Sequence, residues 1–224
     1  MKTSRIYHEL NLDIVSNESG EVCYVLLPDK LKDTEMDWLE EMSLRHSMNI
    51  VVISGMKWNE VLTPWQAPGL SSKEEDFKGK ARYFLDALIG DVFVNTEQSL
   101  RLNNPGRHLV GVSLAGLFAL WATAHTDRLD SAASVSGSLW YDGFSEWFKG
   151  QELQCGRYFI SLGEKEVKSK NERISSVGTL TQEVVQCLKD KGLDVVFSTD
   201  EGNHFDHLRE RLEKAFAFIV GNQY

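Results

Sequence analysis

The sequence has no apolar run that approaches membrane length and no excess of basic residues. Lys and Arg number 24 against 33 Asp and Glu, which gives a net charge of −9. This balance argues against a nucleic-acid backbone or an anionic membrane as the main partner. We expect a neutral or cationic small molecule instead.

Cysteine is scarce, and its spacing forms no motif. Cys23, Cys155 and Cys187 lie far apart without CxxC spacing, so neither a zinc site nor a disulfide framework is indicated. We expect buried thiols in a reducing compartment, and neither a metal nor a cofactor. Residues 1–13, MKTSRIYHELNLD, lack the apolar core of a signal peptide, so we expect a cytoplasmic protein.

Short apolar runs alternate with segments of helical period along the chain. The runs with strand character are VCYVLLP (22–28), NIVVISG (49–55), HLVGV (108–112), SAASVSG (131–137), RYFISLG (157–163) and LDVVFST (193–199). This alternation predicts an α/β protein with a mostly parallel central sheet and helices on both faces. We find no internal repeat and expect one domain over residues 1–224. Ligands of such sheets bind beyond the carboxyl ends of the strands.

Three further segments have clear periodicity. Ile6 to Ile14 alternates like a single edge strand, with His8 on its apolar face. Amphipathic helices are predicted from two sets of apolar residues: Phe77, Ala81, Phe84, Leu85, Leu88 and Ile89, and then Phe205, Leu208, Leu212, Phe216 and Ile219.

The segment GVSLA (111–115) fits a relaxed nucleophile elbow, G-x-S-x-G, in which Ala115 replaces the last glycine. Small residues are needed there because the turn is strained and the helix approaches the strands closely. The pattern alone is weak evidence for a nucleophile, since roughly one chain of this length in six has it by chance. A buried strand before Ser113 and a buried helix after it favour a nucleophile over a helix-capping serine.

A serine nucleophile needs a base within hydrogen-bond reach. In the fold that carries such an elbow, the three catalytic residues follow along the chain in the order serine, acid, histidine. His204 lies in DEGNHFDH (200–207), directly after the last predicted strand, and is the candidate base. His207 is the weaker candidate. A metal site at His204, Asp206 and His207 lacks a third clear ligand.

The acid is expected after the strand RYFISLG, which continues as EKE. Glu164 and Glu166 are two residues apart, so only one of them is expected to reach an imidazole. We prefer Glu166, with Glu164 as the alternative, because an acid three residues after the glycine is the usual layout in hydrolases of this fold.

Two backbone donors are expected to form an oxyanion hole. One is the amide of Leu114. The other is assigned by position to Asp29 or Lys30, in the loop after VCYVLLP, since Pro28 cannot donate. Trp58, Trp65, Trp140 and Tyr141 are candidates for the walls of a substrate pocket, with core packing as the alternative.

Four segments carry a resemblance to a known family: GVSLAGLFALW (111–121), AASVSGSLWYDGF (132–144), YFISLGEKE (158–166) and EGNHFDHLRERLEKAFAFI (201–219). The chain resembles the esterase family of α/β-hydrolases that includes enterochelin esterases, esterase D and feruloyl esterase domains. The resemblance implies a Ser113, Glu166, His204 triad and a site open to carboxylic esters, without a large cap domain. Trp58 and Asn59 stand where siderophore esterases tend to have an arginine, which argues against a ferric-siderophore substrate.

The leading hypothesis is a serine hydrolase that cleaves small carboxylic esters through an acyl-enzyme on Ser113. A hydrolase-fold protein that binds a ligand without turnover is the first alternative. The second is an acyltransferase or thioesterase that uses the same nucleophile.

Overall fold

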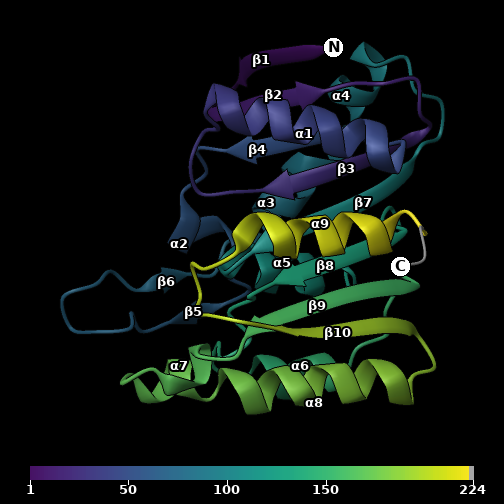
Figure 1. The fold of residues 1–224 in the computed structure, drawn as a ribbon. Helices are drawn as coiled ribbons and strands as arrows, with labels where there is room; N and C mark the ends of the chain where they lie inside the picture. The colour runs from purple at the N-terminus through teal and green to yellow at the C-terminus, as the bar shows by residue number, and fades with distance from the viewer. Residues whose placement is uncertain (222–224) are drawn as a thin grey trace.

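The computed structural model describes residues 1–221. Its centre is an eight-stranded sheet with the strand order β1-β2-β4-β3-β7-β8-β9-β10 (Figure 1). Strand β2 runs antiparallel to β1 and β4, and all other neighbours are parallel. The strands of this sheet are β1 (Lys2–Tyr7), β2 (Leu10–Val15), β3 (Glu21–Leu26), β4 (Asn49–Ser54), β7 (Gly106–Val112), β8 (Ser131–Val135), β9 (Arg157–Gly163) and β10 (Asp194–Asp200).

Helices cover both faces of this sheet. They are α1 (Asp33–His46), α2 (Trp58–Val61), α3 (Ala81–Ala87), α4 (Val94–Ser99), α5 (Leu114–Ala122), α6 (Phe144–Lys149), α7 (Glu172–Ser175), α8 (Val177–Asp190) and α9 (Leu208–Ile219). A π-helical segment, Leu88–Phe93, joins α3 to α4, and a short 3₁₀ turn, Glu166–Lys168, follows β9. The short hairpin of β5 (Gln66–Ala67) and β6 (Phe77–Lys78) projects from the body at the left of Figure 1.

The core is divided by the sheet into two apolar clusters. On one face, α1 and α9 lie side by side and bury Leu39, Met42 and Phe216 against the strands (Figure 1). On the other face, α3, α5, α6 and α8 contribute the larger cluster. Helix α5 is buried at every position, as its sequence predicted. The predicted fold class, a mostly parallel sheet with helices on both faces, is confirmed.

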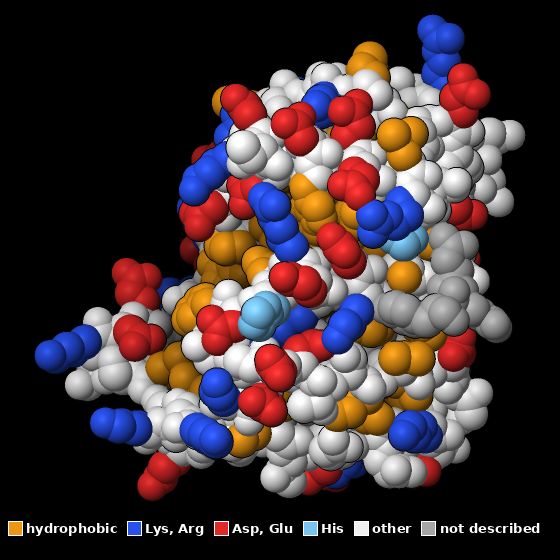
Figure 2. Space-filling model, viewed as in Figure 1, with side chains coloured by type: hydrophobic (Ala, Val, Ile, Leu, Met, Phe, Trp, Pro, Cys, Tyr) orange, Lys and Arg blue, Asp and Glu red, His pale blue; other side chains and the backbone are white. Residues whose placement is uncertain are grey.

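The outer surface over α1 and α9 is charged. Figure 2 shows acidic and basic side chains interspersed on this face, which is consistent with the amphipathic character of both helices. No helix within residues 1–221 is both long and apolar enough to cross a membrane.

The three cysteines are free and buried, as predicted. Burial raises the pKa of the Cys155 thiol to about 11 and also raises the pKa of Cys23. The ionised, nucleophilic form of both thiols is therefore disfavoured at neutral pH.

The stretch from Ile6 to Ile14 is not one strand, so that prediction is wrong. The chain turns at His8, which has a positive φ of 53°, and β1 and β2 pair as an antiparallel hairpin. His8 is exposed, and its Nε2 lies 3.1 Å from Oδ2 of Asp91. It therefore does not share a buried face with Leu12 and Ile14.

Two predicted helices begin later than expected. Phe77 belongs to β6, and the helix begins only at Ala81. Helix α9 begins at Leu208, because His207 has a left-handed backbone with φ 56° that breaks the helical repeat. Phe205 is consequently outside the helix and 86% exposed.

The parallel strands β3, β4, β7, β8, β9 and β10 all end at the same edge of the sheet. The loops that follow β7, β8, β9 and β10 therefore meet there. These loops carry Ser113, the segment 136–143, Glu166 and His204.

Candidate active site

Ser113 occupies a sharp turn between β7 and α5. Its φ of 58° and ψ of −124° lie in a region that residues with a side chain rarely adopt. The Ser113 amide donates to the carbonyl of Val135, and its carbonyl accepts from the amide of Gly116. A Cβ on Gly111 would lie 2.0 Å from the carbonyl oxygen of Ala115, so glycine is required where the strand meets the helix. This geometry is that of a nucleophile elbow.

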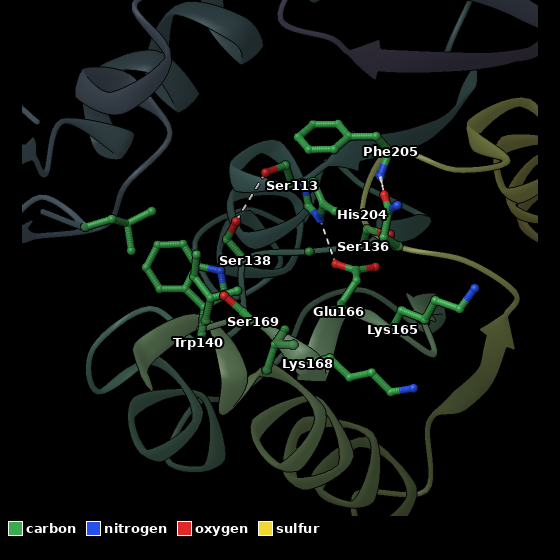
Figure 3. Close-up of a pocket in the computed structure, with 15 residues that line it drawn as sticks. Ser113, Ser136, Ser138, Trp140, Lys165, Glu166, Lys168, Ser169, His204 and Phe205 are labelled. Atoms are coloured by element: carbon green, nitrogen blue, oxygen red, sulfur yellow. Dashed lines mark hydrogen bonds and ion pairs between the residues drawn. The ribbon is translucent and has the colours of Figure 1, made fainter. Parts of the chain in front are cut away.

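The hydroxyl of Ser113 faces a second serine. Its Oγ lies 3.3 Å from Oγ of Ser138, and the Ser138 amide donates to the Ser113 carbonyl (Figure 3). Within residues 1–221 no hydrogen bond joins Ser113 to His204, but both side chains line one cavity of about 520 Å³. Hydrogen bonds between catalytic groups commonly tighten only when substrate binds.

His204 is hydrogen-bonded to Glu166. The imidazole Nδ1 lies 2.6 Å from Oε2 of the carboxylate, which is 8% exposed (Figure 3). The other carboxylate oxygen accepts a 2.7 Å bond from the amide of Gly163, at the end of β9. Glu164 is exposed, and its amide donates to the Asp200 carbonyl. Glu166 is therefore the glutamate that the structure pairs with the imidazole.

Glu166 is held in its ionised form. Burial alone would raise its pKa, but the hydrogen bonds from His204 and Gly163 outweigh this effect and hold the pKa below its ordinary value. An ionised carboxylate only accepts hydrogen bonds, so Nδ1 of His204 carries the proton. The Nε2 atom of this tautomer has a free lone pair.

Arg211, on α9, completes the polar surroundings of Glu166. Its side chain is fully buried, and Nη1 lies 2.5 Å from Oγ of Ser136 and 3.4 Å from Oε1 of Glu166. Arg211 is not among the site residues predicted from the sequence. The feature of the sequence that points to Arg211 is its spacing. It stands three residues after Leu208 and four before Ala215, so its charge lies inside the apolar stripe of an amphipathic helix.

Part of the cavity wall is apolar and consists of Leu70, Trp140, Ile174 and Val177. Leu70 reaches it from the β5–β6 loop, where its carbonyl accepts a 3.0 Å bond from Nδ2 of Asn171. The cavity is lined by Leu70, Ser113, Ser136, Gly137, Ser138, Trp140, Lys165, Glu166, Lys168, Ser169, Ile174, Val177, Asn203, His204 and Phe205.

Of the four aromatic candidates, Trp140 lines the cavity. Tyr141 is fully buried, and its hydroxyl donates a 2.6 Å bond to the carbonyl of Trp65. The Trp65 indole donates to the carbonyl of Asp142, and Trp58 packs against the larger core cluster. Trp58, Trp65 and Tyr141 are not among the lining residues found within 1–221.

The oxyanion candidates lie in two places. Leu114 begins α5 directly after Ser113, so its amide is at the helix N-terminus. Asp29 and Lys30 are exposed in the loop after β3 and, in the described part of the chain, do not line the cavity. The described residues contain no group of three or more His, Cys, Asp or Glu side chains arranged to hold a metal ion.

Known proteins resemble this chain in sequence and in fold. The sequence model of the family described as "Putative esterase" matches residues 30–214. The "Uncharacterized protein YbbA" of Bacillus subtilis (strain 168) is 25% identical over 221 residues, which cover 92% of this chain and 88% of that protein.

Solved structures share the fold. The siderophore hydrolase EstA from Aspergillus nidulans matches with a TM-score of 0.74 and 18% identity over 100% of this chain and 95% of that one. An IroE-like serine hydrolase from Shewanella oneidensis matches with a TM-score of 0.74 and 20% identity over 98% of this chain and 78% of that one. The family resemblance predicted from the sequence and the α/β-hydrolase fold are thereby confirmed. Residues 1–221 contain no large cap domain. Because the family match spans most of the chain, the protein belongs to this esterase family and is a carboxylic ester hydrolase that acts on small-molecule esters.

Proposed function

We propose that the protein hydrolyses small carboxylic esters through an acyl-enzyme on Ser113. The observation that carries the proposal is that the hydrogen-bonded His204–Glu166 pair shares one cavity with the hydroxyl on the elbow. Nucleophile, base and orienting acid are the groups that this chemistry requires.

In the proposed reaction, the Ser113 hydroxyl turns from Ser138 toward Nε2 of His204. Nε2 accepts the hydroxyl proton as Oγ forms a bond to the acyl carbon, and the carbonyl π electrons move to oxygen. The tetrahedral intermediate then expels the alcohol, which takes the proton from His204. Water attacks the acyl-enzyme with the same base, and the carboxylic acid and free Ser113 are released.

Glu166 has two roles in this scheme. Its carboxylate fixes the proton on Nδ1, so that Nε2 is the basic nitrogen, and it stabilises the imidazolium that forms during each step. The lowered pKa of Glu166 supports both roles, because the group stays ionised at neutral pH.

The oxyanion is proposed to be held by the Leu114 amide at the start of α5 and by a second amide from the loop after β3. Asp29 and Lys30 are the candidates for this second donor. Their position in that loop, which follows a strand adjacent to β7, supports the assignment.

The substrate is proposed to carry an apolar or aromatic group. Leu70, Trp140, Ile174 and Val177 form an apolar wall beside Ser113 and His204. One of the solved structures named above is a siderophore hydrolase, but Trp58 and Asn59 stand here where an arginine is expected in that class. We therefore place the natural substrate among simpler esters.

Hydrolysis of p-nitrophenyl butyrate tests these roles. We expect Ser113→Ala and His204→Ala to lower kcat by roughly 10³-fold or more, and Glu166→Ala to lower it less. Glu164→Ala, which removes the exposed glutamate, is the matched control. It should keep kcat within about 3-fold of wild type.

Each alternative predicts a different result. Loss of activity in Glu164→Ala but not in Glu166→Ala would show that the acid is misassigned. A folded wild type that turns over no ester would favour a binding protein. Butyrate transferred to added alcohols or thiols in preference to water would favour an acyltransferase.

A further inference from the structure

The guanidinium of Arg211 joins three segments of the active site. Nη1 donates to Oγ of Ser136 in the loop after β8 and lies 3.4 Å from Oε1 of Glu166 in the loop after β9. Nη2 donates to the carbonyls of Glu201 (3.1 Å) and Asn203 (3.0 Å), in the loop that carries His204. The side chain is 1% exposed, so these contacts are shielded from water.

The charge of Arg211 is balanced by two buried carboxylates. Glu166 lies on one side of the guanidinium, and on the other Nε is 3.7 Å from Oδ2 of Asp200. Asp200 also forms an ion pair with Lys214. A planar guanidinium can reach several acceptors in fixed directions at once, which the single ammonium of a lysine cannot do.

The end of β9 is shaped around this side chain. A Cβ on Gly163 would lie 2.7 Å from Nη2 of Arg211 and 2.8 Å from the carbonyl oxygen of Gly202. The amide of the same glycine donates to Oε1 of Glu166. Gly163 thus lets Arg211, the acid and the histidine loop pack against one strand end.

We propose that Arg211 is a positioning residue: it fixes the Glu166 carboxylate and the His204 loop so that the imidazole faces Ser113. Through Ser136 it also anchors the segment that leads to Ser138, the present partner of the Ser113 hydroxyl. The inference rests on the proposed roles of Ser113, His204 and Glu166, and Arg211 itself does not touch the reacting atoms.

Steady-state kinetics of Arg211→Met test the proposal. We expect kcat for p-nitrophenyl butyrate to fall about 10- to 100-fold while KM changes less than about 3-fold, because orientation is lost but the cavity walls remain. Arg211→Lys keeps the positive charge but not the planar guanidinium. Its kcat should lie between those of Arg211→Met and wild type. The matched control is Arg209→Met, two residues away on α9, where the exposed guanidinium packs over Trp38.

A double-mutant cycle with Glu166→Gln separates positioning from a general structural effect. If Arg211 acts through Glu166, the losses of kcat in the two single variants should not multiply, and the double variant should be within about 3-fold of Glu166→Gln. Losses that multiply in full, or a folded Arg211→Met with the kcat of Arg209→Met, would overturn the proposal. Should Arg211→Met not fold, the same cycle with Arg211→Lys decides between these outcomes.

The proposed function has its own separate control in the same assay. Wild-type kcat in Ser113→Ala would remove the catalytic scheme on which the inference rests. An inactive Ser113→Ala together with a fully active Arg211→Met would disprove only the positioning role of Arg211.

Discussion

Ser113 adopts a backbone conformation that glycine accepts more readily than serine does. A non-glycine residue at φ 58° and ψ −124° costs about 1–3 kcal/mol, and the surrounding turn must hold it in place. The hydrogen bonds from the Gly116 and Leu117 amides to its carbonyl, and from its own amide to Val135, do so. The strain presents the hydroxyl at the strand end, within the cavity that also contains His204.

The ionisation of Glu166 predicts a pH dependence of stability. Its pKa is lower in the folded protein than its ordinary value of 4.5, so the folded state binds the proton less readily than the unfolded state. The stabilisation is therefore complete above pH 4.5 and is lost as the pH falls through the lower, folded pKa. Wild type should lose this contribution on acidification, and Glu166→Gln has none to lose.

Thermal unfolding between about pH 7 and pH 3 measures this effect. The difference in Tm between wild type and Glu166→Gln should be constant above about pH 5.5 and shrink at lower pH. The exposed Glu164→Gln is the matched control and should show no such change. A difference that grows on acidification would mean that the carboxylate is not stabilised in its ionised form.

The elbow at Ser113 depends on close packing between β7 and α5. Gly111→Ala should destabilise the protein by about 1–3 kcal/mol, because the new Cβ would lie 2.0 Å from the backbone oxygen of Ala115. Gly20→Ala is the control, since a Cβ at Gly20 would have no atom of residues 1–221 within 4 Å apart from its chain neighbours. Denaturant titration compares the two variants, and equal stabilities would argue against this close packing.

The sequence predicted the elements whose apolar pattern is long or continuous. The buried strands β3, β4, β7, β8 and β9 and the wholly apolar α5 follow from their own residues. The turn at His8 was missed because nothing at His8–Glu9 resembles a Gly, Pro or Asn turn signal, and the alternation continues across it. The start of α9 was missed for a similar reason, since the left-handed conformation of His207 has no signal in residue type.

The candidate site was predictable where position along the chain decides it. Ser113, Glu166 and His204 each follow a strand, and parallel strands bring such residues to one edge. Contacts between side chains distant in sequence were not predictable. That Trp140 lines the cavity while Trp65 and Tyr141 pack together depends on how the segment between β8 and α6 meets the residues before β5, and composition carries no information about this.

We propose that the chain forms one domain. A single sheet runs from β1 to β10, and helices from the two ends of the chain, α1 and α9, cover the same face. Loss of esterase activity, near-ultraviolet circular dichroism and far-ultraviolet circular dichroism should therefore coincide in a denaturant titration. Two separated transitions would indicate two independently folding units.

Covalent labelling with a serine-reactive probe tests whether Ser113 is the nucleophile. A fluorophosphonate should form one adduct on the folded wild type, and peptide mass spectrometry should locate it on the tryptic peptide that contains Ser113. Ser138→Ala should still be labelled, whereas folded Ser113→Ala should not. An adduct that persists in folded Ser113→Ala, or that maps to Ser138, would contradict the account.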